Sequence, residues 1–284
     1  MISPAQIELE TLFDGRLRAW RLRADGEPIR THGSDLLPVR LADGRPAMLK
    51  HSRALEERAG AALMAWWDGD GAARVLASAE GVLLLERAMG RRDLLAWAIA
   101  SEASDDAASI VICGVLDRLH APRTTPPPPL HPLGDWFDAL RRRATAEGGL
   151  SGECAGLADG LVEASTDYVP LHGDCHHRNV LDFGARGWLA IDPKDRCGER
   201  AFDHALILCN PDLPHAAVPA RFARQLAVIA RSARLDATHL ARWTAARAAL
   251  SAAWFMEDGE DAAASHVMAV ARTALDWIAA NPAA

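Results

Sequence analysis

Three polar residues, Asp174, Asn179 and Asp192, have types and spacings that suit one shared reaction. Four residues separate Asp174 from Asn179, and Asp192 follows after a segment with the pattern of a hairpin. Phosphoryl transfer from ATP needs a base that accepts the proton of a hydroxyl group, and ligands that hold magnesium. Asp174 suits the base, whereas Asn179 and Asp192 suit the metal because magnesium prefers oxygen ligands.

The segment between Asn179 and Asp192 is predicted to be a β-hairpin. Residues 179–183 have the pattern of a short strand, and residues 188–191 have the pattern of the returning strand. Between them, residues 184–187 begin and end with glycine, which adopts turn conformations that other residues resist. The hairpin would bring Asp192 back beside Asn179, so that both side chains can bind one cation.

A literal Asp-Phe-Gly motif begins at Asp182, but its position does not suit the metal role. In protein kinases the metal-binding aspartate of this motif lies well beyond the asparagine of the catalytic loop. Asp182 is only three residues beyond Asn179. We therefore predict that Asp182 is a solvated turn residue and that Asp192 is the metal ligand.

Three histidines near Asp174 leave a second interpretation open. His172 and His176 are four residues apart, which on a helix suits zinc binding, and His177 follows them. The glutamate that such zinc motifs carry after the first histidine is replaced here by Gly173, which also weakens a helix. A zinc-dependent hydrolase is the weaker alternative, and His176 and His177 are expected to be core or loop residues.

Bulk composition limits the classes of protein that fit the chain. Its 284 residues, half of them hydrophobic, allow one large domain or two closely joined lobes. The net charge of -7 argues against a nucleic-acid partner and is compatible with a cationic small-molecule substrate.

Cysteine usage and the N-terminus bear on location. Five cysteines without a Cys-x-x-Cys pair suit a reducing compartment. The first residues lack the basic start and apolar run of a signal peptide, and no apolar stretch is long enough to cross a bilayer. We expect a cytoplasmic protein with no membrane partner, either a monomer or a weak dimer.

The N-terminal third has the pattern of a small sheet with helices. Asp43 and Gly44 form a strong turn signal between two apolar runs. Helices are predicted at 4–13 and 55–66, and strands at 36–41, 46–50, 75–78 and 82–86.

The rest of the chain is predominantly helical apart from the hairpin. Residues 108–119 form an amphipathic face, and the prolines at 126–129 predict a stiff connector. Further helices are predicted at 133–143, 156–165, 220–232, 237–254 and 262–279. The whole pattern predicts an α+β fold, with a small β-rich lobe over residues 1–87 and a larger, mostly helical lobe over residues 88–284.

Lys50 ends a predicted strand, and two glutamates follow on the next helix. A lysine in this place would bind the α- and β-phosphates of a nucleotide, and a glutamate would hold the lysine by an ion pair. The spacing does not choose between Glu56 and Glu57. Without the residues near Asp174, the pattern would indicate no more than solvated surface charge.

Two further segments suit a nucleotide. Ser34 follows His32 and Gly33, and backbone amides near glycine can bind the oxygens of a phosphate. Glu86 and Ala88 lie in the link between the two lobes, whose exposed backbone can pair with a purine. The simpler interpretation of this link is a plain connector.

Several acidic residues could receive a cationic substrate. Asp203 begins a predicted helix, where it could cap the N-terminus or orient the Asp174 loop by hydrogen bonds. Glu199 and Glu257 are the other main candidates, with further acidic residues at 258, 260 and 261. Taken singly, each is more often a solvated surface residue than a functional one.

The chain resembles the aminoglycoside phosphotransferases in His172-Gly173-Asp174, in Asn179 and in the string IDPK at 191–194. Longer strings make it similar to the streptomycin 6-phosphotransferase branch, grouped with the aminoglycoside/hydroxyurea resistance kinases. These strings are GSDLLPV at 33–39, LK at 49–50, LLLER at 83–87, LHAP at 119–122, GERAFD at 198–203 and LSAAW at 250–254. The similarity runs from about Gly33 to the C-terminus.

The resemblance implies a protein-kinase-like fold of two lobes with ATP and Mg²⁺ between them. Asp174 would be the base, Asn179 and Asp192 the magnesium ligands, and Lys50 the phosphate-binding lysine with Glu57 as its partner. The implied acceptor is streptomycin, whose guanidinium groups suit an acidic pocket. The other candidate site residues are His172 for support of the loop, Ser34, Glu86 and Ala88 for the nucleotide, and Glu199, Asp203, Trp254 and Glu257 for the substrate.

Two departures from the family pattern leave the acceptor open. Asp195 stands where relatives carry glycine, and Cys175 replaces a leucine. A kinase of hydroxyurea or of another small hydroxylated metabolite would share every catalytic residue. A catalytically silent nucleotide-binding module is a further alternative, although the full set of polar residues argues against it.

Overall fold

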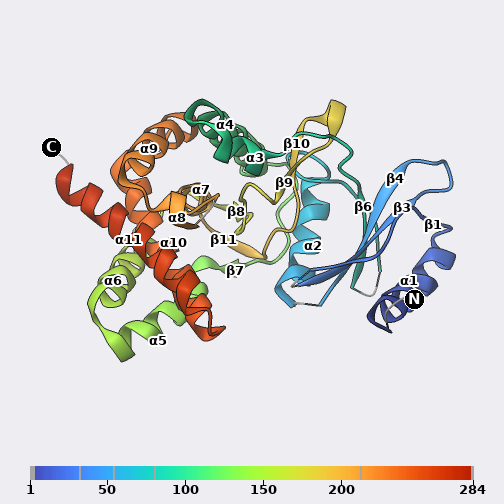
Figure 1. Ribbon diagram of the computed structural model, residues 1–284, viewed down its shortest axis with the longest axis horizontal. Coiled ribbons are helices and arrows are strands. Elements are labelled where there is room, and N and C mark those ends of the chain that lie inside the picture. The colour runs from blue at the N-terminus through green and yellow to red at the C-terminus, as the bar shows by residue number, and fades with distance from the viewer. Residues whose placement is uncertain (1–3, 32, 54, 80, 212, 283–284) are drawn as a thin grey trace.

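A sheet-rich lobe and a helical lobe lie at opposite ends of the computed structural model (Figure 1). The structure describes residues 4–31, 33–53, 55–79, 81–211 and 213–282, and the side chains of all of these except 4–11, 55–58 and 213–214. The N-terminal helix belongs to the sheet-rich lobe, and the chain ends in the helical lobe (Figure 1). The predicted α+β fold with two lobes is confirmed.

The sheet of the N-terminal lobe has the order β1-β3-β4-β6-β5, with β2 paired to β3, and all of its pairs are antiparallel. Its strands are β1 (Arg23–Ala24), β2 (Ile29–Arg30), β3 (Ser34–Arg40), β4 (Pro46–Ser52), β5 (Val75–Ala79) and β6 (Val82–Glu86). The predicted hairpin at Asp43 and Gly44 is confirmed, because Arg40 at the end of β3 lies opposite Pro46 at the start of β4.

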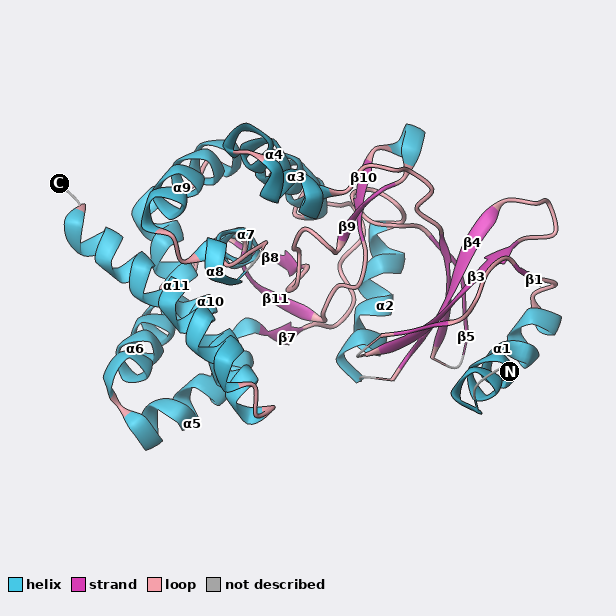
Figure 2. Cartoon of the chain, viewed as in Figure 1, coloured by secondary structure: helices cyan, strands magenta, loops and turns pink. Residues whose placement is uncertain are grey.

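Apolar residues cover both faces of this sheet. Val82 and Leu84 of β6 pack in one cluster with Phe13, which belongs to helix α1 (Pro4–Ala19). Leu83 and Leu85 point to the opposite face and pack with Met64 of helix α2 (Leu55–Trp67), as the alternation of a strand requires. Helix α1 is longer than the predicted 4–13, and α2 lies between the sheet and the helical lobe (Figure 2).

The C-terminal lobe is built around α10, which contacts α5, α6, α7, α9 and α11. Its helices are α3 (Leu94–Ala100), α4 (Glu102–Leu119), α5 (Asp138–Glu147), α6 (Gly149–Glu163), α7 (Ala201–Leu208), α8 (Leu213–Ala216), α9 (Pro219–Ala233), α10 (Ala237–Glu257) and α11 (Asp261–Ala280). The predicted helices are all present, but residues 133–137 form a 3-10 turn before α5, and α6 begins seven residues earlier than expected. None of the described helices is long and apolar enough to span a membrane.

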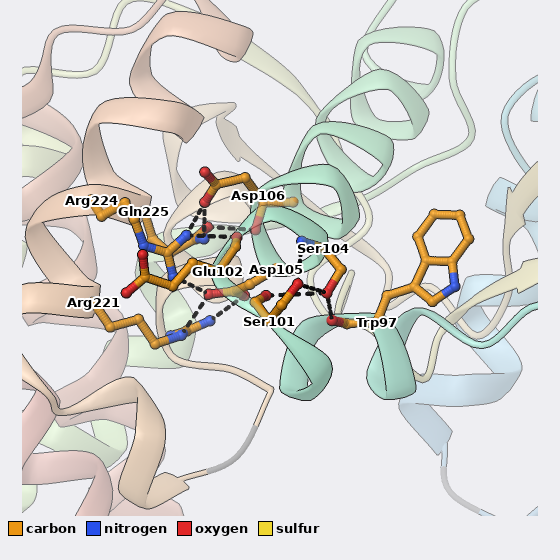
Figure 3. A network of polar contacts seen from close by, with 10 residues as sticks. Trp97, Ser101, Glu102, Ser104, Asp105, Asp106, Arg221, Arg224 and Gln225 are labelled. Atoms are coloured by element: carbon orange, nitrogen blue, oxygen red, sulfur yellow. Dashed lines mark hydrogen bonds and ion pairs between the residues drawn. The ribbon is translucent and has the colours of Figure 1, made fainter.

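Helices α4 and α9 are joined by a polar network that the amphipathic pattern did not predict (Figure 3). Asp105 of α4 is buried and accepts hydrogen bonds from Arg221 at 2.9 and 2.8 Å and from Arg224 at 2.7 Å. Gln225 donates to Asp106 and accepts from Ser109 in the same contact, each at 2.7 Å. Breaking one partner of such a buried pair is expected to destabilise the fold, because the remaining charge would be desolvated without compensation.

Two small sheets lie where the lobes meet. One contains β7 (His131–Pro132), β8 (Tyr168–Leu171) and β11 (Arg196–Glu199), which the sequence analysis missed because these strands are very short. The other is the predicted hairpin of β9 (Val180–Asp182) and β10 (Trp188–Ala190), in which Val180 lies opposite Ala190. The two turn glycines, at 184 and 187, have φ angles of 63° and 75°, as the turn prediction required.

The hairpin also touches the N-terminal lobe. Ala190 donates its N–H to the carbonyl oxygen of Gly71 and accepts a hydrogen bond from the N–H of Ala73, both at 2.8 Å. The chain itself crosses between lobes in the segment after β6, before α3 begins at Leu94. We keep residues 87 and 88 as the proposed boundary.

Candidate active site

The loop that carries Asp174 is anchored by a buried carboxylate. Asp203, in the first turn of α7, is fully buried and accepts hydrogen bonds from the N–H groups of His172 at 2.8 Å and Gly173 at 2.7 Å. His120 Nε2 lies 2.9 Å from the same carboxylate. Burial alone would raise the pKa of Asp203, but the hydrogen bond and the charge of His120 hold it below its usual value.

These contacts decide between the roles predicted for Asp203. Its function in orienting the Asp174 loop agrees with the structure, whereas the helix cap does not, because α7 has no side-chain cap. The substrate role is wrong, since a carboxylate with no exposed surface and with its oxygens bonded inside the protein cannot meet a ligand.

His172 connects the loop to the hairpin. Its ring is buried and stacked on Trp67, with the ring centroids 6.2 Å apart. Nε2 donates to the carbonyl oxygen of Ile191 at 2.8 Å, and Nδ1 accepts the N–H of Asp174 at 3.2 Å. Burial lowers the pKa of His172, so the neutral ring can donate at one nitrogen and accept at the other. One side chain thereby fixes the position of Asp174 relative to the residue before Asp192.

Asn179 lies directly beside Asp174. Its Nδ2 donates to the backbone oxygen of Asp174 at 2.8 Å and to the carboxylate at 3.2 Å. Ile191 donates its N–H to the carbonyl oxygen of Asn179 at 2.9 Å, which closes the hairpin as predicted and leaves Asp192 next in the chain. Because the amide nitrogen faces Asp174, the amide oxygen is the atom of Asn179 that suits a cation.

Asp192 meets a lysine from the other lobe. Lys50 Nζ, in the buried side chain of a β4 residue, lies 2.7 Å from Asp192 Oδ1. Asp192 has a left-handed backbone conformation, with φ of 62°, which aspartate tolerates better than most residues. The structure thus brings together Lys50, Asp174, Asn179 and Asp192, and the oxygen atoms of the last two suit magnesium.

Helix α2 packs closely on the loop after Asp192. A side chain at Gly60 would overlap the carbonyl oxygen of Pro193, so glycine is what permits the helix to approach. The side chains of Glu56 and Glu57 lie outside the described residues, and the pairing of Glu57 with Lys50 stays a prediction. Their backbones belong to the first turn of α2.

The remaining nucleotide candidates lie around the edge of the N-terminal lobe. Ser34 is buried at the start of β3, where its N–H donates to Thr31 Oγ1 at 3.1 Å. Glu86 ends β6, accepts the N–H of Arg74 at 2.6 Å and pairs with Arg186 of the hairpin turn. Ala88 is half-buried in the link between the lobes. Their nucleotide roles stay predictions.

The prediction that Asp182 is a solvated turn residue is wrong. It is 6% exposed, lies in β9 and accepts two hydrogen bonds from the guanidinium of Arg92, both at 2.8 Å, and one from the N–H of Gly184 at 3.0 Å. The hydrogen bonds from Arg92 hold the pKa of Asp182 well below its usual value. Its partner is 90 residues away in the chain, so local spacing gave no sign of this pair.

A cavity of about 730 Å³ opens beside Asp174. Trp254 and Glu257, two of the predicted substrate residues, lie in its wall. Glu199 does not line it, because its carboxylate is buried and bonded to His239 of α10. The remaining lining residues are Trp136, Gly173, His176, Lys194, Leu206, Cys209, Asn210, Arg247, Ser251, Phe255, Asp258, Glu260 and Val267.

Arg247 is the most prominent cavity residue that the sequence analysis missed. It lies on α10 four residues before Ser251 and seven before Trp254, so all three fall on one face of the helix. That spacing, starting from the predicted Trp254, is the signal that could have found it. Trp136, which packs edge-on against Trp254 at 5.3 Å, comes from a distant segment and had no such signal.

The histidines do not form the metal cluster of the zinc alternative. His172 is bonded as described above, and His177 is buried, with its pKa lowered to about 3 by desolvation. Among the residues that the structure describes, no group of three His, Cys, Asp or Glu side chains is placed to hold a metal. The position of His176 Nε2, 3.8 Å from Asp174 Oδ1, allows it to act electrostatically on the base.

Fold and site together define a protein-kinase-like enzyme that transfers a phosphoryl group to an alcohol. The chain belongs to the aminoglycoside/hydroxyurea antibiotic resistance kinases, whose family model matches residues 19–259. This match confirms the family predicted from the sequence motifs. It begins earlier than the predicted residue 33 and ends at residue 259, before the C-terminus.

Individual relatives agree with this assignment. A streptomycin 3''-kinase from Klebsiella pneumoniae is 49% identical over 250 residues, which cover 86% of this chain and 92% of that protein. A streptomycin 6-kinase from Streptomyces griseus is 34% identical over 268 residues, covering 89% and 84%. The crystal structure of the aminoglycoside phosphotransferase APH(4)-Ia has the same fold, with a TM-score of 0.66 at 14% identity over 93% of this chain and 98% of that one.

Proposed function

We propose that this enzyme transfers the γ-phosphoryl group of ATP to a hydroxyl of streptomycin in a magnesium-dependent reaction. The observation that carries the proposal is the meeting of Lys50 with Asp192 beside Asn179 and Asp174. Asp174 in turn lines a cavity with acidic side chains. The streptomycin kinases among the relatives support the choice of acceptor.

Asp174 would accept the proton of the acceptor hydroxyl as the phosphoryl group arrives. Its carboxylate is held by Asn179 Nδ2, and its backbone N–H is held by His172 Nδ1, so the base is fixed before substrate binds. Such preorganisation is the main contribution that a protein makes to phosphoryl transfer.

The donor end of the site would be formed by both lobes. Lys50 would bind phosphate oxygens, with Glu57 as its proposed partner, and Ser34, Glu86 and Ala88 are the proposed nucleotide residues of the sheet and the link. Asn179 Oδ1 and Asp192 would hold the metal. Magnesium, when bound, neutralises negative charge on the transferred phosphate.

The acceptor end would bind a cationic aminocyclitol. Glu257, Asp258 and Glu260 lie together at the end of α10 and in the turn that follows it, and all three line the cavity. Carboxylates bind guanidinium groups by paired, charge-assisted hydrogen bonds. Trp254 would pack against a sugar ring in the same wall.

All five cysteines are free thiols in the structure, which suits a reducing compartment. We therefore propose a cytoplasmic location, and we propose in addition that the enzyme works as a monomer or a weak dimer.

The first test is ADP formation in the presence of Mg²⁺ and streptomycin, with other aminoglycosides and hydroxyurea as parallel acceptors and GTP as an alternative donor. Turnover with streptomycin that is lost on adding EDTA and in Asp174→Ala would support the proposal. Turnover with hydroxyurea alone would transfer the assignment to that acceptor.

Two other outcomes would contradict the proposal in different ways. Slow, Asp174-dependent ATP hydrolysis without any accepted acceptor would keep the kinase chemistry and discard the substrate. Nucleotide binding without hydrolysis or transfer would indicate a catalytically silent module. Unchanged turnover in Asp174→Ala would discard Asp174 as the base.

A further inference from the structure

We propose that Arg247 determines which ring of the acceptor reaches the base. It would bind uncharged oxygens of the ring beside Asp174 and keep guanidinium groups at the acidic end of the cavity. This inference rests on the proposed function and deepens it. In streptomycin both guanidinium groups are on one terminal ring, which carries position 6, and position 3'' is on the amino sugar at the other end. Arg247 would therefore direct the phosphate to the amino sugar.

The first observation is that Arg247 is a buried cation without a carboxylate partner in the described part of the chain. It is 4% exposed and lines the cavity together with Asp174. Its Nη1 donates a hydrogen bond to Ser251 Oγ on the next turn of α10, and its buried Nε has no partner among the described residues. A buried charge is costly unless it is paired, so the guanidinium group of Arg247 is suited to binding oxygen atoms that a ligand supplies.

The second observation is that the guanidinium is held in place by aromatic rings. It lies 5.3 Å from the ring centroid of Phe202 and 5.2 Å from that of Trp254. Burial lowers the pKa of Arg247, whereas the nearby carboxylates of Asp174 and Asp203 act in the opposite direction. An arginine side chain stays protonated in proteins, so the group presents a fixed positive charge to the cavity.

The third observation is the separation of charge along the cavity wall. Glu257 follows Arg247 by ten positions on helix α10, a rise of about 15 Å at 1.5 Å per residue. Asp258 and Glu260 follow directly, and neither forms an ion pair with any residue that the structure describes. Guanidinium groups would be attracted to this acidic end and repelled by Arg247 at the other.

A pseudotrisaccharide such as streptomycin can reach from Arg247 to the acidic end of the cavity, and the charges favour one of its two possible orientations. With its guanidinium ring at Asp258 and Glu260, streptomycin would place the amino sugar, which has a single amine, beside Arg247 and Asp174. The opposite orientation would bring two guanidinium groups against a buried arginine. The polarity of the cavity therefore selects the ring that is phosphorylated.

The test is the position of the phosphate in the product, determined by correlated ³¹P and ¹H NMR after turnover of streptomycin. The wild-type enzyme is expected to modify the amino sugar. Arg247→Gln is expected to raise the KM for streptomycin about tenfold or more, with the KM for ATP unchanged, and to yield a mixture of products. Arg247→Lys keeps the charge, so it should retain the single product with a smaller rise in KM.

Arg242→Gln is the matched control, since it makes the same change at an exposed position of the same helix and should leave both KM values unchanged. A phosphate on the guanidinium ring of the wild-type product would overturn the inference and leave the proposed function intact. So would a lowered melting temperature in Arg247→Gln with unchanged KM and product. No turnover of streptomycin by the wild type would overturn the proposed function itself, and this inference with it.

Discussion

The loop that holds Asp174 and the cavity that faces it differ in how their polar groups are satisfied. In the loop, the groups around Asp174 are bonded within the protein, through Asp203, His172 and Asn179. In the cavity wall, Arg247 has a buried Nε without a partner among the described residues, and Asp258 and Glu260 form no ion pair there. The loop is preorganised for one reaction, whereas the wall keeps its charges available for a ligand.

This difference indicates which substitutions should affect the chemistry and which should affect the acceptor. A change in the loop or hairpin removes bonds that the folded chain already makes, so it should reduce the rate or the stability. A change in the wall removes contacts that form on binding, so it should alter the KM for the acceptor. The following predictions test that division, from the largest expected effect to the smallest.

The largest effect is expected from the two aspartates that compete for the metal role. Asp192→Asn should reduce turnover on the order of a thousandfold and weaken magnesium-dependent nucleotide binding, because the metal supplies several kcal/mol to the transition state. Asp182→Asn removes a bond to Arg92 and should lower the melting temperature while magnesium dependence is kept. Steady-state kinetics over a magnesium titration, with thermal melts, would separate the two. A greater loss of magnesium affinity in Asp182→Asn would reverse the assignment.

A packing change beside the metal loop should come next. Gly60→Ala would overlap Pro193, so α2 or the loop must move, and we expect a loss of about 1–3 kcal/mol in the free energy of unfolding together with reduced turnover. Gly156→Ala is the matched control, because it lies inside α6 with nothing within 4 Å of the added methyl group. That change should be neutral or stabilising by up to about 1 kcal/mol.

Chemical denaturation of both glycine variants, followed by kinetics, measures this prediction. Equal stability and equal turnover in the two variants would show that the close packing of α2 on Pro193 has no role in forming the site.

Acidification should destabilise the loop region through buried histidines. His177 has a folded pKa of about 3, whereas an unfolded histidine titrates near 6.5, so the unfolded chain takes up the proton first. The stability that His177 contributes is complete above about pH 6.5 and is lost as the pH falls toward 3. The slope is about 1.4 kcal/mol per pH unit.

His177→Leu should flatten the dependence of the unfolding free energy on pH between 6.5 and 5, because leucine does not titrate. The substitution removes no hydrogen bond, since both ring nitrogens are buried without partners within the described structure. His266→Leu, at an exposed position of α11, is the control and should leave the slope unchanged. Denaturant titrations at several pH values measure it, and an unaltered slope in His177→Leu would contradict the prediction. His204, with a folded pKa of about 4, should supply part of the slope that is left.

The smallest effect is expected at the exposed end of the cavity. Glu257 is half-exposed and pairs with Arg142 at 2.8 Å, so Glu257→Gln should raise the KM for streptomycin only a few-fold, within about 1 kcal/mol. The maximal rate should not change. Glu153→Gln, an exposed change on α6, is the control for charge alone. A drop in the maximal rate with constant KM would place Glu257 with the catalytic loop instead.

Two features could be predicted from the sequence because they are local. The hairpin from Asn179 to Asp192 was readable because glycines at 184 and 187 specify its turn, and pairing across a two-stranded hairpin then fixes its register. Most of the longer strands and helices were readable from the period of their apolar residues, whereas the short strands β1, β2, β7, β8 and β11 were not. The motif order predicted the family and the two-lobed fold, and both were confirmed.

Tertiary structure alone decided the partners of charged side chains. The pair of Asp182 with Arg92 cannot be predicted from the sequence, because the arginine is distant in the chain and nothing in a local pattern encodes such a pair. The same holds for Glu199, which is bonded to His239, and for Asp203, which is bonded to the Asp174 loop. Helical spacing places Arg247 on the same face of α10 as Trp254, but only the tertiary structure shows that this face lines a cavity. Apolar periodicity and turn chemistry are properties of neighbouring residues, whereas the burial and pairing of a charge depend on which distant segments fold against it.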